Sequence, residues 1–112
     1  RELVATLMFE IDDPVRRDAL LRRLGRVEET VTIELGGEIV HAVPEVQDGV
    51  ERTKADGKTS SIHFLRFPFT DGQIAAFRDP AVRAVLAIGH AEYAHMAVLP
   101  EPVREALQQD FD

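Results

Sequence analysis

Apolar residues recur at every second position near the start of the chain. The odd-numbered positions from Leu3 to Ile11 are all apolar, and Val4 and Met8 between them are apolar too. This period of two predicts a β-strand, and a strand that is apolar on both faces is typical of the centre of a sheet. Asp13 and Pro14 then predict the start of a helix, with Asp as N-cap and Pro at the first helical position.

Two alternating segments, TVTIEL and EIVHAV, flank Gly36-Gly37 and predict a tight hairpin. A two-residue loop places Ile33 opposite Val40, with both side chains pointing inward. The same register places His41 on the outer, solvated face.

The stretch from Pro44 to Lys58 is too polar for a core element, so we expect a mobile loop over residues 47–58. A strand over SSIHFLRFPF follows. Thr70-Asp71-Gly72-Gln73 then matches a capping box and predicts a short helix. Residues 82–89 predict the last strand, and Pro100 introduces a terminal helix whose expected inward residues are Val103, Ala106, Leu107 and Phe111.

These elements predict one α+β domain over residues 1–112. We expect a ferredoxin-like sandwich, in which a mixed sheet of about five strands carries two or three helices mainly on one face. The chain has 112 residues, and 45% of them are hydrophobic. It contains no apolar run near the ~20 residues that a membrane span needs, so no membrane association is expected.

Charge and cysteine content exclude several classes of chemistry. The chain has no cysteine, which removes thiol catalysis, disulfides and cysteine-based metal sites. The net charge of -7 argues against nucleic-acid binding, which depends on clustered Lys and Arg. A cytoplasmic location is expected.

The segment IGHAEYAH, residues 88–95, carries the first candidate ligand-binding residues. His90 ends a buried strand and Tyr93 follows it closely. Their side chains could fix the turn by hydrogen bonds, contact a ligand or act in catalysis, and the first alternative is favoured because no nucleophile or phosphate motif accompanies them. Arg66, which needs a carboxylate or a ligand anion beside Phe64 and Phe67, and His63 in the same strand are further candidates.

His90, Glu92 and His95 form a conceivable metal site. A spacing of five residues between the two histidines does not fit one face of a helix or of a single strand, so only a loop could bring both to one ion. We therefore expect no metal and no other cofactor.

The first helix and the residue just beyond its end present a basic set of candidate partner-binding residues: Arg16, Arg22 and Arg23 on the helix, and Arg26 after it. Such a stripe could touch RNA or an acidic partner, or it could be a solvated basic face. The acidic total and the lack of interleaved aromatic residues favour the solvated face.

Three segments, ELVATLMFEI, SSIHFLRFPFT and AIGHAEYAHMAVLPEPVREALQQDF, together resemble the C-terminal part of the bacterial "domain of unknown function 3501" family. His90, Tyr93, Arg66, Phe67 and Leu107 match its pattern, although Ala91 stands where the family tends to have Pro. The resemblance implies a longer protein with an N-terminal helical region rich in Arg and Lys, and a link to redox or oxidative-stress metabolism through neighbouring genes. It implies no activity.

The sequence thus favours a non-catalytic module that binds a protein partner or an N-terminal region of its own longer chain. The alternative is a small-ligand sensor or an enzyme with a pocket near His90, Tyr93 and Arg66. The sequence does not decide whether the chain forms a homo-oligomer.

Overall fold

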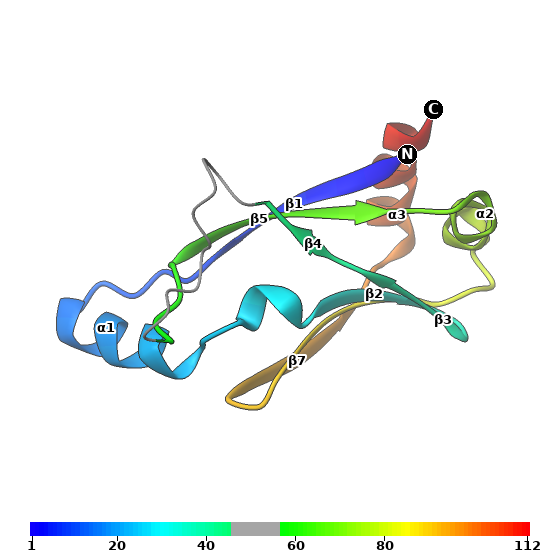
Figure 1. Ribbon diagram of the computed structural model, residues 1–112. Helices are drawn as coiled ribbons and strands as arrows, with labels where there is room; N and C mark the ends of the chain where they lie inside the picture. The colour runs from blue at the N-terminus through cyan, green and yellow to red at the C-terminus, as the bar shows by residue number, and fades with distance from the viewer. Residues whose placement is uncertain (46–56) are drawn as a thin grey trace.

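The computed structural model describes residues 1–45 and 57–112, and it confirms an α+β fold. The mobile loop predicted over residues 47–58 lies outside these ranges except for Gly57 and Lys58. Figure 1 shows an elongated molecule with a long axis of about 44 Å. Its elements, where η marks a 3-10 helix, are β1 (Glu2–Met8), α1 (Pro14–Arg23), η1 (Val27–Glu29), β2 (Val31–Leu35), β3 (Glu38–His41), β4 (Val43–Pro44), β5 (Ile62–Pro68), α2 (Asp71–Arg78), β6 (Ala84–His90), β7 (Tyr93–Val98), α3 (Glu101–Leu107) and η2 (Gln108–Phe111).

The strands form two sheets. One has the order β1-β5-β4 and the other has the order β3-β2-β6-β7. Every pairing is antiparallel. The finer prediction of a single mixed sheet of ferredoxin-like type is therefore not confirmed, because strand pairing divides between two layers whose inner faces share one core.

A single extended stretch connects the two sheets. β3 pairs with β2, and β4, which begins two residues after β3 ends, pairs with β5 in the other sheet. Backbone bonds continue on both sides of the crossing, since Ala42 N–H donates to Val31 O (3.0 Å) and Glu45 N–H donates to Phe64 O (2.8 Å). The sandwich is thus closed along this side, whereas β1 and β7, on the other side, are edge strands of their sheets.

Local predictions from turn and cap residues are confirmed. The hairpin pairs Ile33 with Val40, and His41 is exposed. Asp13 caps α1 by accepting a hydrogen bond from Val15 N–H (2.9 Å). The capping box that begins α2 is complete, with both reciprocal bonds between Thr70 and Gln73 present.

The helices lie at the ends of the sandwich and not over one sheet face, which corrects the expected arrangement. α1 is at one end of the long axis, and α2 and α3 gather at the opposite end (Figure 1). None of the described helices is both long enough and apolar enough to cross a membrane. No described helix covers the outer face of either sheet (Figure 1), and large apolar side chains such as Val4 and Met96 are exposed there.

The terminal helix faces the core differently from the prediction. Val103 and Ala106 are exposed and Leu107 is half-buried, whereas Arg104 is buried with only 7% of its surface exposed. Its guanidinium donates to backbone carbonyls from the end of α2 and the following turn. Nη1 bonds Val82 O (2.6 Å), and Nη2 bonds Phe77 O (2.7 Å), Asp79 O (3.1 Å) and Ala76 O (3.3 Å).

This arrangement explains how Arg104 can be buried without an ion pair to any carboxylate in the described part of the chain. A helix leaves its last carbonyls unpaired, and these carry partial negative charge that a cation stabilises. The guanidinium carbon also lies 5.4 Å from the centre of the Phe77 ring. Arg104 therefore fastens α3 to α2 at the end of the sandwich.

Replacing Arg104 with Met should lower the free energy of unfolding by about 3 kcal/mol, because the substitution leaves buried carbonyls without donors. Urea unfolding of Arg104→Met beside Arg83→Met would measure this. Arg83 is exposed, and its replacement should change stability by less than about 0.5 kcal/mol. Equal effects of the two substitutions would contradict the assigned role.

Candidate functional site

The segment IGHAEYAH forms a β-hairpin that the sequence did not predict. His90 ends β6 and pairs with Tyr93, the first residue of β7, so Ala91 and Glu92 form a two-residue loop. The strand expected to be last is therefore followed by another, which runs to Val98. His90 and Tyr93 are cross-strand partners and lie on the same face of the hairpin.

Both ring nitrogens of His90 are engaged in hydrogen bonds. Glu92 N–H donates to Nδ1 (3.0 Å), and Nε2 lies 2.8 Å from Gly25 O. A backbone N–H can only donate and a carbonyl can only accept, so this geometry assigns Nδ1 as the acceptor and Nε2 as the donor. His90 thus joins the hairpin loop to the segment after α1, and any metal or substrate would have to displace one of these bonds.

Two more contacts hold the end of α1 and the residues after it in place. Arg23 Nη2 lies 3.6 Å from Glu92 Oε2, which ties α1 to the hairpin loop. A Cβ atom on Gly25 would lie 2.5 Å from Gly57 O, so the backbones at residues 25 and 57 approach more closely than any other residue permits.

His63 belongs to a buried polar cluster with Glu28 and Thr59. His63 is fully buried, and Glu28 and Thr59 are nearly so. His63 Nε2 lies 2.8 Å from Ser60 O and 3.2 Å from Thr59 Oγ1, and Thr59 Oγ1 donates to Glu28 Oε1 at 3.3 Å. The carbonyl of Ser60 fixes Nε2 as a donor, so the cluster joins β5 to η1 inside the sandwich.

Aromatic rings connect this interior to the hairpin. Phe9 makes edge contacts with His63 (6.3 Å between ring centres) and with Tyr93 (5.8 Å). Tyr93 also packs against His95, with 4.4 Å between ring centres. Tyr93 is thus a packing residue at the open edge of the sandwich.

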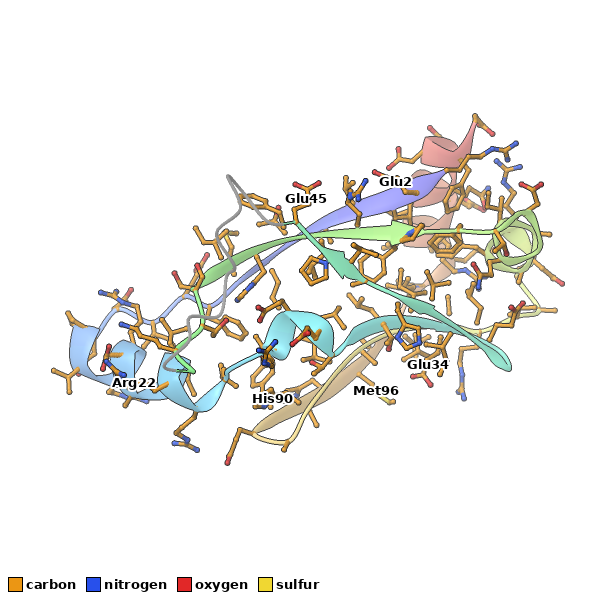
Figure 2. The ribbon with its side chains drawn as sticks, viewed as in Figure 1. Glu2, Arg22, Glu34, Glu45, His90 and Met96 are labelled. Atoms are coloured by element: carbon orange, nitrogen blue, oxygen red, sulfur yellow. The ribbon has the colours of Figure 1, made fainter. Side chains whose placement is uncertain are left out.

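Arg66 lies apart from these residues. It projects from the outer face of β5, where its guanidinium is 3.5 Å from Glu2 and 3.6 Å from Glu45. Figure 2 shows those two carboxylates on the opposite layer from His90. The structure therefore does not bring Arg66 to a common site with His90 and Tyr93.

The hairpin places the candidate metal ligands differently from what their spacing predicted. The hairpin pairs His95 with Ile88, so His90 and His95 lie on the same face, and the argument from a single strand was wrong. Within residues 1–45 and 57–112, however, no group of three or more potential ligands is close enough to hold a metal ion.

Neighbouring carboxylates pair with most of the basic candidates on α1 and with Arg26, which follows that helix. Arg22 pairs with Asp18 (3.0 Å) and Arg26 with Glu29 (3.0 Å), while Arg23 pairs with Glu92. Lys58 also bonds Asp18, and this bond, followed by that from Arg22, lowers the pKa of the Asp18 carboxyl. Of the four candidates, Arg16 alone forms no ion pair among the described residues.

The outer sheet faces carry surface features that the sequence analysis did not select. On the three-stranded sheet, Val4 is 66% exposed and Met8 54% exposed, and apolar neighbours from β4 and β5 share that face. On the four-stranded sheet, Met96 is 71% exposed beside a groove. The signal in the sequence was the high apolar content of both faces of β1 and β7.

Replacing His90 with Ala should lower the free energy of unfolding by about 1–3 kcal/mol, because Gly25 O and Glu92 N–H lose their partner. The exposed His41 offers a matched control, and His41→Ala should change stability by less than about 0.5 kcal/mol. Thermal and urea unfolding would measure both, and a chelator should not alter the wild-type curve. Stoichiometric zinc, iron or nickel that is lost in His90→Ala would contradict a structural role.

Replacing Gly25 with Ala should destabilise the domain by about 2 kcal/mol or more, because the added methyl meets a backbone oxygen that cannot move freely. Gly72→Ala is the control, since a Cβ atom there meets nothing within 4 Å and Ala favours the helix. Urea unfolding should show loss of stability in the first variant only. A wild-type midpoint for Gly25→Ala would show that the two backbones do not meet.

Comparison with known proteins gives a relative of the same fold. The chain is similar to a protein of unknown function from Burkholderia pseudomallei K96243, whose crystal structure was solved at 1.90 Å resolution. The two share 30% sequence identity with a TM-score of 0.81, over 99% of this chain and 56% of that one. This chain therefore spans little more than half the length of that relative.

No protein of curated function matches the chain. The family described as "Protein of unknown function (DUF3501)" matches residues 1–111, which confirms the resemblance seen in the strand motifs. The chain therefore belongs to the DUF3501 family.

Proposed function

We propose that the domain is a non-catalytic module that binds a protein partner through the outer faces of its sheets. The observation that carries this proposal is the exposure of large apolar side chains on a sheet that no segment of residues 1–45 and 57–112 covers. The outer face of the three-stranded sheet, taken here as Val4, Met8, Val43, Ile62 and Phe64, has each of these side chains at least 39% exposed. Arg66, paired with Glu2 and Glu45, lies beside Val4 and Val43 on the same face, and exposed apolar side chains with polar neighbours are typical of interaction sites.

The chemistry of the interior supports binding over catalysis. Both ring nitrogens of His90 form hydrogen bonds with backbone groups, and His63 Nε2 bonds the Ser60 carbonyl. The alternative function, a sensor or enzyme with a pocket near His90, Tyr93 and Arg66, would need these side chains to converge. Arg66 instead lies on an outer face between two carboxylates.

Two sources of the partner fit this proposal. The Burkholderia relative is longer than this chain, so the partner can be another region of a longer protein or a separate protein. We take the module to be bacterial and linked to redox or oxidative-stress metabolism, because the family resemblance implies that context. A cytoplasmic location is also part of the proposal and rests on the sequence, which has no cysteine.

Photocrosslinking in cells tests the proposal. A benzophenone amino acid would replace Val4 or Met8 on the outer face and, as a control, the exposed Gln109 in η2. We expect discrete products of higher mass from the two face positions and none from the control. A second substitution, Val4→Asp in the Met8 crosslinking variant, should abolish these products, because a charge in an apolar interface disfavours association.

Crosslinks that are absent from both face positions, or equally abundant at Gln109, would contradict a binding role for this face. A reaction catalysed by the purified domain and lost in His90→Ala, with the fold retained, would favour the alternative.

A further inference from the structure

The outer face of the four-stranded sheet contains a groove of about 500 Å³. Its floor consists of small residues on β6 and β7, namely Ala87, Gly89 and Ala94. Ile39 on β3 and Met96 on β7, both exposed, line it on either side. Small residues between larger ones leave a trough that runs along the strands.

One carboxylate interrupts this apolar surface. Glu34 lines the groove, and its cross-strand neighbours are Ile39 on one side and Val85 on the other. Its side chain forms no ion pair with any described residue. Figure 2 shows Glu34 and Met96 projecting from the same layer, away from the other sheet.

A half-buried carboxylate between aliphatic neighbours favours a cation that brings its own apolar stem. Arginine and lysine have this form, with an aliphatic chain that packs on apolar surface and a charged tip. A free metal ion or a compact ammonium would gain nothing from Ile39 and Met96. The groove thus fits a side chain that is apolar along its length and cationic at its end.

We propose that this groove binds an extended segment of a partner protein, with an Arg or Lys of that segment paired to Glu34. This inference rests on the proposed function and names the chemistry of one partner. Glu34 pairs with Val85, and Gly89 lies four residues further along β6. Four residues of a strand span about 13 Å, which is the length of the groove between Glu34 and Gly89.

The groove length predicts a motif in the partner. Alternate residues of an extended chain are about 6.7 Å apart and point to the same side. A cation at Glu34 is therefore followed by apolar residues two and four positions later, which lie over Ala87 and Gly89. The motif is Arg or Lys, any residue, an aliphatic residue, any residue, and a second aliphatic residue.

Charge decides between this occupant and a second copy of the chain. The chain carries a net charge of -7. Stacking two of these faces would bring the Glu34 carboxylates of both copies into one apolar interface, where like charges repel strongly. A basic segment instead neutralises Glu34.

Three variants separate the contributions of charge and shape. Glu34→Gln removes the charge and keeps the size of the side chain. Gly89→Val fills one end of the groove, and its Cβ meets only Thr30 O, at an ordinary 3.8 Å. Glu38→Gln is the control, because Glu38 is exposed at the tip of the β2–β3 hairpin, outside the groove.

Fluorescence polarisation with labelled nine-residue peptides tests the proposal. One peptide contains the sequence Arg-Thr-Val-Thr-Val, and two others carry norleucine or Glu in place of Arg. We expect saturable binding of the Arg peptide, weaker by about tenfold or more for norleucine, as loss of a charge-assisted pair implies. Glu34→Gln should weaken only the Arg peptide, Gly89→Val should weaken the Arg and norleucine peptides, and Glu38→Gln should stay within about twofold of wild type.

Absence of saturable binding by the Arg peptide would overturn the proposal, as would equal binding of the Arg and Glu peptides. A concentration-dependent dimer that Gly89→Val abolishes would overturn it in favour of a second copy. Crosslinks at Val4 and Met8 report on the other sheet. If they persist while the peptides fail, the groove proposal falls and the proposed binding function stands, and if both fail, neither stands.

Discussion

The architecture depends on one extended stretch, residues 38–45, that bonds to both sheets. β3 completes the four-stranded sheet, and β4, after Ala42, completes the three-stranded one. This shared strand fixes the separation of the layers on one side and turns their inner faces toward a common core. With η1 and the His63 cluster inside and the helices at the two ends, nothing in the described chain covers the outer faces. The exposed apolar surface is thus a direct consequence of the topology.

Features set by neighbouring residues were predictable from the sequence. The Gly36-Gly37 loop fixes the register of the β2–β3 hairpin, because a two-residue loop allows only one pairing. Asp13 and the Thr70–Gln73 pair mark the starts of α1 and α2, because the orphan N–H groups of a first turn need an acceptor nearby. Each of these features involves residues within a few positions of one another, so the local pattern is sufficient.

Features that depend on distant segments were not predictable in this way. The division into two sheets depends on which strand residues 43–44 pair with. No local signal shows that they pair with β5 instead of extending the pairing of β3 with β2. β7 was missed because its loop, Ala91-Glu92, lacks the Gly, Asn or Pro that usually marks a turn. Arg104 was not among the residues expected to face inward, since its carbonyl partners lie more than twenty positions away. Glu34 looked like any outward residue of an alternating strand.

Locating a bound peptide on the sandwich tests the proposed groove most directly. Isotope-filtered NMR of the uniformly 13C-labelled domain, with the unlabelled Arg peptide bound, would report its position. We expect contacts from the first valine after the Arg to the methyl groups of Ala87 and Met96, which are paired across β6 and β7. Contacts instead to protons of His90 or Tyr93, with none to Ala87 or Met96, would contradict the proposed groove and would place the binding site at the hairpin histidine.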